Sequence, residues 1–88
     1  MKITDLDPEI RLNQFAEECI EAAHAALKLS RVFSRSTPVS EEEARKRLVE
    51  EIADVSVCMT ALSDIAPQKD VCEVITQKSS RWEERINA

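Results

Sequence analysis

The chain contains no glycine among its 88 residues. Glycine is the residue that lets a backbone approach a phosphate closely, so the P-loop and the dinucleotide-binding fingerprint are both excluded. Tyrosine is also absent and there are only three prolines, which leaves few helix breakers and little preference for strands. The sequence therefore predicts an all-α fold in a single domain spanning residues 1–88.

Hydrophobic periodicity predicts three helices, over residues 8–33, about 41–65 and about 68–86. Each shows apolar residues recurring three or four positions apart, and the first two should form an antiparallel hairpin. The expected stripes are Leu12, Phe15, Ala16, Cys19, Ala23, Ala26 and Leu27 on the first helix; Leu48, Ile52, Val55, Met59 and Leu62 on the second; and Val71, Val74, Ile75, Trp82 and Ile86 on the third.

Capping residues support these boundaries. Asp7 before Pro8 is typical of a helix start, because proline suits the first helical position. Ser40 and Glu43 form a predicted capping box, in which each side chain bonds the other residue's backbone N–H. Pro67 marks the boundary between the second and third helices.

The second helix is apolar on nearly every side after Asp54, and such a helix needs neighbours on every side. Two partner helices from an 88-residue chain do not supply them, so the sequence predicts a homo-oligomer whose second copy completes a four-helix-bundle-like core. The apolar residues after Asp54 are Val55, Val57, Cys58, Met59, Ala61, Leu62 and Ile65. The part that should be buried between chains lies around Val57, Cys58, Ala61 and Ile65.

Composition limits the partners and the compartment. A net charge of −5 argues against a nucleic-acid-binding function, and no apolar run reaches the roughly 20 residues that span a bilayer. The polar, acidic start of the chain does not resemble a signal peptide. Cys19, Cys58 and Cys72 are an odd number of cysteines without zinc-site spacing, and we expect them to be reduced, buried thiols of a cytoplasmic protein.

Two acidic clusters are the candidate functional residues. Glu18 and Glu21 lie one helical turn apart with Glu17 beside them, and Glu51 and Asp54 are similarly spaced on the second helix. On antiparallel helices the two pairs could bring four carboxylates together. Hard cations such as Mg²⁺ or Mn²⁺ prefer such oxygen ligands.

A simpler interpretation is that the glutamates of the first helix are only a solvated face opposite its apolar stripe. The second cluster is harder to explain in this way, because Glu51 and Asp54 share a sector with apolar residues. Neither has a lysine or arginine four residues later, since Val55 and Cys58 occupy those positions. Ion pairing within the helix is therefore not expected to neutralise them.

Residues 17–21 (EECIE) match the EExxE motif of the MazG-like all-α nucleoside triphosphate pyrophosphohydrolases, and residues 51–54 (EIAD) match their ExxD motif. The resemblance covers residues 12–59 well and the last third of the chain loosely. Either motif alone is weak, but the two occur in the family's order on two helices of a chain of this size. The chain thus resembles that family.

The resemblance implies Mg²⁺-dependent hydrolysis of a (deoxy)nucleoside triphosphate to the monophosphate and pyrophosphate, in a homodimer or a dimer of dimers and in the service of nucleotide-pool clean-up. By motif position the metal ligands would be Glu18, Glu21, Glu51 and Asp54. Glu17 would bind a second metal ion or orient the attacking water. Phosphoribosyl-ATP pyrophosphohydrolase is a variant within the same family, and a non-catalytic helical interaction module is the alternative from another class.

The remaining candidates would contact the substrate. The family often has a lysine followed by an asparagine in its last helix, whereas this chain has Lys78 without the asparagine. Lys78 and Arg81 are candidates for phosphate contacts, and Trp82 and His24 for contacts with the base or phosphates. Each also has a structural interpretation: a basic side chain extended from the edge of the core, a core tryptophan, or an exposed helical histidine.

Overall fold

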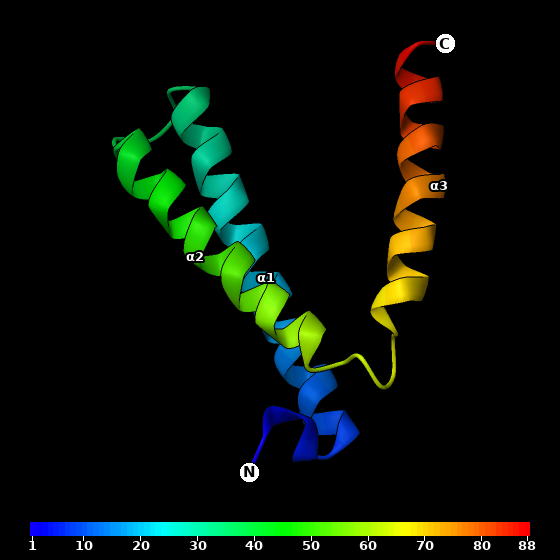
Figure 1. Cartoon of the computed structure of the whole chain (residues 1–88). Helices are drawn as coiled ribbons and strands as arrows, with labels where there is room; N and C mark the ends of the chain where they lie inside the picture. Colours follow the sequence, from blue (N-terminus) through cyan, green and yellow to red (C-terminus); the bar gives the residue numbers. More distant parts are fainter.

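The computed structural model describes all 88 residues and contains only helices. A short 3-10 helix, η1 (Ile3–Asp5), precedes α1 (Pro8–Phe33), α2 (Glu41–Thr60) and α3 (Gln68–Ile86). α1 and α2 lie side by side as a hairpin, and α3 extends away from it as a separate arm (Figure 1). The all-α prediction is confirmed, as are the bounds of α1 and α3. No helix combines the length and the hydropathy that crossing a membrane requires.

The helix ends follow the capping predictions in part. The Ser40 hydroxyl accepts a hydrogen bond from the Glu43 backbone N–H at 3.1 Å, but the carboxylate of Glu43 does not bond back to Ser40. Asp7 precedes Pro8 without making a side-chain cap. Beyond α1, Arg35 adopts a φ of 59°. Glycine usually occupies this left-handed conformation after a helix, but the chain contains no glycine.

α2 is shorter than predicted, since it ends at Thr60 and residues 61–65 form tight turns. The helical pattern stops where the Leu62 N–H donates to the Met59 carbonyl rather than to that of Cys58. Just beyond, the Ala61 carbonyl accepts a bond of 2.7 Å from the Arg11 guanidinium, and the N–H of Ile65 donates to Leu62. A long-range contact that no local pattern reveals therefore holds the turn that follows the early end of α2.

The interface between α1 and α2 holds nearly all of the buried residues. Alanines allow the two helices to approach closely, and Leu29 and Leu62 fill the rest of the interface. Arg11 and Glu51 are the two charged residues in this core, at 5% and 2% exposure. The buried apolar residues are Ala25, Leu29, Ala44, Ala61 and Leu62.

The apolar stripes do not all point into this interface. On α1 most of the predicted stripe is turned away from α2, so that Leu12 and Leu27 are 43% and 56% exposed, whereas Phe15 and Cys19 are half-buried. Glu18, predicted to lie opposite that stripe, faces α2 instead. On α2 the stripe is divided: Leu62 is buried, whereas Ile52 is 52% exposed. The helices therefore have second apolar faces that a single chain leaves uncovered.

α3 buries none of its residues. Apart from the half-buried Val71, its large apolar side chains are exposed, including Trp82 at 64%. All three cysteines are free, as expected, but the prediction that all are buried is wrong, because Cys72 on α3 is exposed. The expectation for the end of α2 also needs correction. Ala61 is covered by its own chain rather than by a second copy.

The Arg11 guanidinium connects three segments. It donates to the Leu6 carbonyl at 2.9 Å, to the Ala61 carbonyl at 2.7 Å and to the Asp64 carboxylate through Nη1 and Nη2. The bidentate pair with Arg11 lowers the pKa of Asp64 from its ordinary value of 3.8. The turn between α2 and α3 is thus tied to α1.

Arg11→Met should lower the melting temperature by several degrees, because it leaves the Ala61 carbonyl without its partner. Arg45→Met is the matched control. Its ion pair with Glu41 is exposed on both sides, so the substitution should change the melting temperature little.

Because Asp64 has a lowered pKa, its contribution to stability is present above pH 3.8 and is lost as the pH falls through its folded pKa. Wild type should therefore lose more stability than Arg11→Met below about pH 4, and parallel acid melts of the two would contradict this role.

Candidate metal centre

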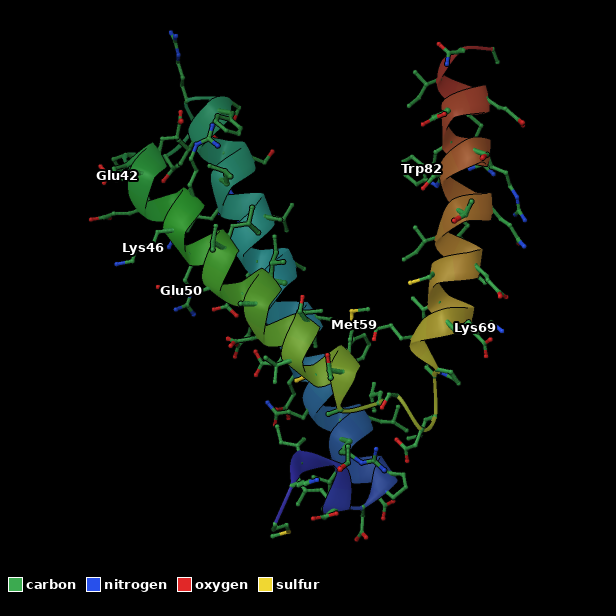
Figure 2. The ribbon with its side chains drawn as sticks, in the orientation of Figure 1. Glu42, Lys46, Glu50, Met59, Lys69 and Trp82 are labelled. Atoms are coloured by element: carbon green, nitrogen blue, oxygen red, sulfur yellow. The ribbon has the colours of Figure 1, made fainter.

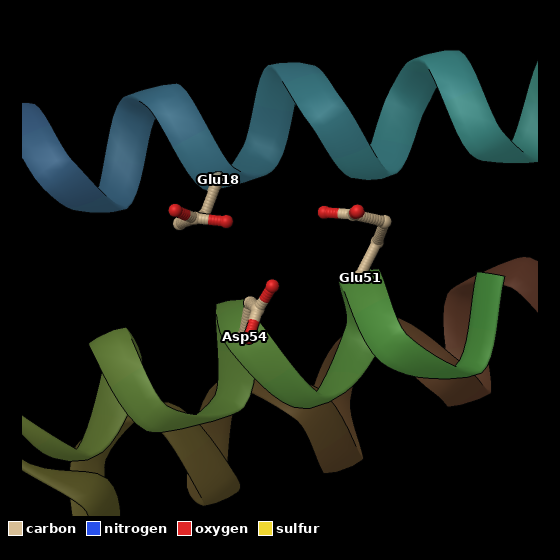
Figure 3. A group of neighbouring side chains, drawn as sticks. All are labelled: Glu18, Glu51 and Asp54. Carbon is tan, nitrogen blue, oxygen red and sulfur yellow. The ribbon is translucent and has the colours of Figure 1, made fainter. Parts of the chain in front are cut away.

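Three carboxylates meet between α1 and α2. One oxygen each from Glu18, Glu51 and Asp54 lies within 4.8 Å of the others, and the close-up shows Glu18 opposite the two residues of α2 (Figure 3). Glu51 is buried, Glu18 is half-buried and Asp54 is exposed. The group thus begins in the helix interface and opens to solvent at Asp54.

The hydrogen bonds of the group leave two oxygens free. Glu18 Oε1 accepts from the amide of Gln14 at 2.8 Å. Glu18 Oε2 and Glu51 Oε2 are buried and have no hydrogen-bond partner. Buried polar atoms usually have a partner, and each of these two oxygens could accept a hydrogen bond or bind a cation.

Arg47 partly neutralises the cluster. Its Nη2 lies 2.8 Å from Glu51 Oε1, an ion pair between residues four apart on α2. The expectation that no ion pair forms within the helix is therefore wrong: the partner lies four residues before Glu51 rather than after it. Burial nevertheless raises the pKa of Glu51, with Glu21 and Asp54 adding to the rise and Arg47 opposing it.

The Cys58 thiol borders the carboxylates. Burial raises its pKa, and the negative charges of Glu18 and Asp54 raise it further. A thiol in this environment stays protonated at neutral pH and does not act as a thiolate ligand. The cluster therefore offers only oxygen atoms, the donor set that Mg²⁺ and Mn²⁺ prefer.

The other two predicted acids lie beside this group. Glu21 is close enough to Glu51 to raise its pKa, but it is not among the three residues whose oxygens converge. Glu17 is exposed, and it is rotated about 100° from Glu18 around the α1 axis. The structure thus brings three of the five predicted acids together, with Glu21 adjacent and Glu17 outside.

A small cavity of about 270 Å³ adjoins the acids along the hairpin. Its lining includes Glu21, His24 and Lys28 from α1 and Arg47 from α2. His24 was a predicted substrate contact, whereas Lys28 and Arg47 were not. The signal for Arg47 was present in the sequence, because it stands four residues before Glu51 on the same helix face.

The remaining predicted substrate contacts are on the separate arm. Lys78, Arg81 and Trp82 are all exposed on α3, and Figure 2 shows Trp82 well away from the hairpin. Within one chain they do not join the carboxylates. Lys78 and Trp82 instead line a groove along α3 together with Val71 and Ile75.

No family model matches this chain, and no curated protein or solved structure matches it either. The resemblance to the MazG-like enzymes therefore depends on the two acidic sequence motifs alone.

Proposed function

We propose that this protein is a Mg²⁺-dependent pyrophosphohydrolase of (deoxy)nucleoside triphosphates. The observation that carries the proposal is the convergence of Glu18, Glu51 and Asp54, whose oxygens lie within 4.8 Å of one another. Burying a carboxylate such as Glu51 beside two others is unfavourable unless cations compensate. Arg47 compensates one oxygen of Glu51 and leaves the second without a partner.

The residues present suit a hard divalent cation. Glu18, Glu51 and Asp54 would hold it through carboxylate oxygens, and Mn²⁺ suits the same ligands. When bound, such an ion lowers the pKa of an attacking water and stabilises the charge that develops on phosphoryl oxygens. Glu21 is placed to accept a proton or to join the ligand set, and Glu17 stays a candidate for a second ion or for orienting the water.

The basic side chains beside the acids would bind the phosphates. His24, Lys28 and Arg47 line the adjoining cavity. The positive charge of Lys28 and Arg47 would offset the charge of a triphosphate, and the His24 ring could hydrogen-bond to it. Once Glu51 is neutralised by a cation, Arg47 is free to turn toward a phosphate. Of the four predicted substrate contacts, His24 is the one that lies beside the carboxylates within a single chain.

The proposal includes self-association, as a homodimer or a dimer of dimers, in a cytoplasmic protein of nucleotide-pool clean-up. Met59 and Ile65 on the chain's surface are 42% and 43% exposed, and a second copy could cover them. A non-catalytic interaction module is the second candidate. The Arg47–Glu51 ion pair favours it, because such a pair reduces the need for a metal ion.

A substrate screen tests the chemistry. Incubation with the common NTPs and dNTPs in Mg²⁺ should release pyrophosphate and a nucleoside monophosphate. Release of orthophosphate with a diphosphate product would mean attack at the γ-phosphate and would overturn the assignment. If no triphosphate is hydrolysed, the interaction module becomes the better interpretation.

A further inference from the structure

The chain exposes more surface than a folded protein of its mass should. Its accessible surface is 7046 Å² at 9.9 kDa, whereas monomeric proteins of this mass expose about 5,200 Å². The excess is about 1,800 Å² per chain. A standard interface buries about 800 Å² per partner, and obligate homodimers bury more. The excess is therefore large enough for an obligate interface.

Part of this excess is one side of the hairpin, here called the apolar face and formed by Leu12, Ala16, Leu27, Ile52 and Met59. Leu12 follows the buried Arg11, and Ile52 follows the buried Glu51. Each is thus rotated about 100° in the same sense from the contact line between the helices. Because the helices are antiparallel, the same rotation brings both residues to the same side of the hairpin.

A second part is one side of the arm, here called the α3 stripe and formed by Ile65, Val71, Ile75, Trp82 and Ile86. From Val71 onward these residues are spaced by four, seven and four positions, as expected for an apolar helix face. Ile75 is 53% exposed and Ile86 is 76% exposed. In Figure 2, Met59 and Trp82 lie on the sides of α2 and α3 that face the space between hairpin and arm.

We propose that two copies exchange their arms, so that the α3 stripe of each copy packs on the apolar face of the other. The lengths match, since α2 has 20 residues and α3 has 19. Arg11 binds Ala61 and Asp64 and so fixes the base of the arm in an extended direction. The exchange is reciprocal and closes with two-fold symmetry, which buries both unpartnered surfaces of both chains at once.

The exchange has a consequence for the metal centre. Asp54 precedes the half-buried Val55 and Glu21 precedes the half-buried Ala22, so both are rotated in the opposite sense, away from the apolar face. The partner's α3 would therefore lie across the hairpin from the acids. This arrangement assigns Trp82 to the interface and leaves phosphate contacts to the side that carries His24. The exchange goes beyond the proposed hydrolysis and does not depend on it.

Complementation between two interface variants tests the exchange without any assay of turnover. Ile52→Lys damages the apolar face, and Ile75→Lys combined with Trp82→Phe damages the arm and removes the only tryptophan. Wild type should be a dimer by light scattering at about 100 µM, and each variant alone should dissociate at least about thirtyfold more readily. Mixed in equal amounts, they restore one intact arm–face contact, so a dimer should reappear. Trp82 of the Ile52→Lys chain should then shift its emission to shorter wavelength.

Val57→Lys is the matched control, because Val57 is as exposed as Ile52, at 54% against 52%, but lies outside the apolar face. The Val57→Lys variant should remain a dimer. Leu27→Lys replaces Ile52→Lys if circular dichroism shows that the latter is unfolded. An arm variant that stays dimeric alone, or a mixture that stays monomeric with unshifted emission, would overturn the exchange. A monomeric wild type would also overturn the exchange. In that case, emission from a buried Trp82 would show that α3 closes on its own hairpin, and emission from an exposed Trp82 would indicate a surface for a different protein.

Discussion

Glu51→Gln is expected to abolish turnover and, in EDTA, to melt at a higher temperature than wild type. Without a cation, the buried Glu51 carboxylate lies beside Glu18 and Asp54, and like charges at that separation repel. The substitution removes the repulsion but also removes a carboxylate oxygen that the proposed Mg²⁺ would need. Mutating residues that only support metal ligands typically lowers activity 10- to 100-fold. For Glu51→Gln we therefore expect turnover to fall at least about a hundredfold. Pyrophosphate release and thermal melts in EDTA measure the two effects.

Glu50→Gln is the control for this experiment. It makes the same change of charge one residue away, on an exposed side chain that points away from α1 (Figure 2), and it should leave both turnover and melting temperature nearly unchanged. Asp54→Asn should behave like Glu51→Gln in turnover. Equal behaviour of the Glu50 and Glu51 variants would mean that net charge, rather than a metal centre, determines both properties.

Mg²⁺ is expected to stabilise the wild-type protein strongly. At about 100 times its dissociation constant, a ligand that binds only the folded state adds about 2.7 kcal/mol to the free energy of unfolding. For a domain of this size each kcal/mol raises the melting temperature by roughly 4–8 °C, so a rise of about 10–20 °C should be seen. Glu51→Gln should lose most of that response, because the cluster would then lack one of its three converging carboxylates.

Sodium chloride at matched ionic strength separates binding from screening, since screening acts on all the carboxylates alike. It should reproduce little of the Mg²⁺ effect in wild type. An equal response of wild type and Glu51→Gln to Mg²⁺ would indicate that the carboxylates are only solvated and would favour the interaction module.

Local patterns were sufficient to predict the helices. The bounds of α1 and α3 follow from Pro8, Pro67 and the 3.6-residue periodicity, and all are observed. The candidate acids were also visible in the sequence, because Glu51 and Asp54 stand one turn apart on an otherwise apolar sector. These features depend on residues within one or two turns of each other, and a sequence records such relations directly.

The sequence alone therefore determined an all-helical chain, the starts of its helices and an acidic group on two of them. The tertiary structure decided which side of each helix is buried, because α1 and α2 each have two apolar faces and periodicity does not choose between them. It also decided how the turn after Thr60 is held, since Arg11 reaches the Ala61 carbonyl from 50 residues away, and it revealed that α3 buries none of its residues within its own chain. These are relations between distant residues, and they exist only once the helices have packed.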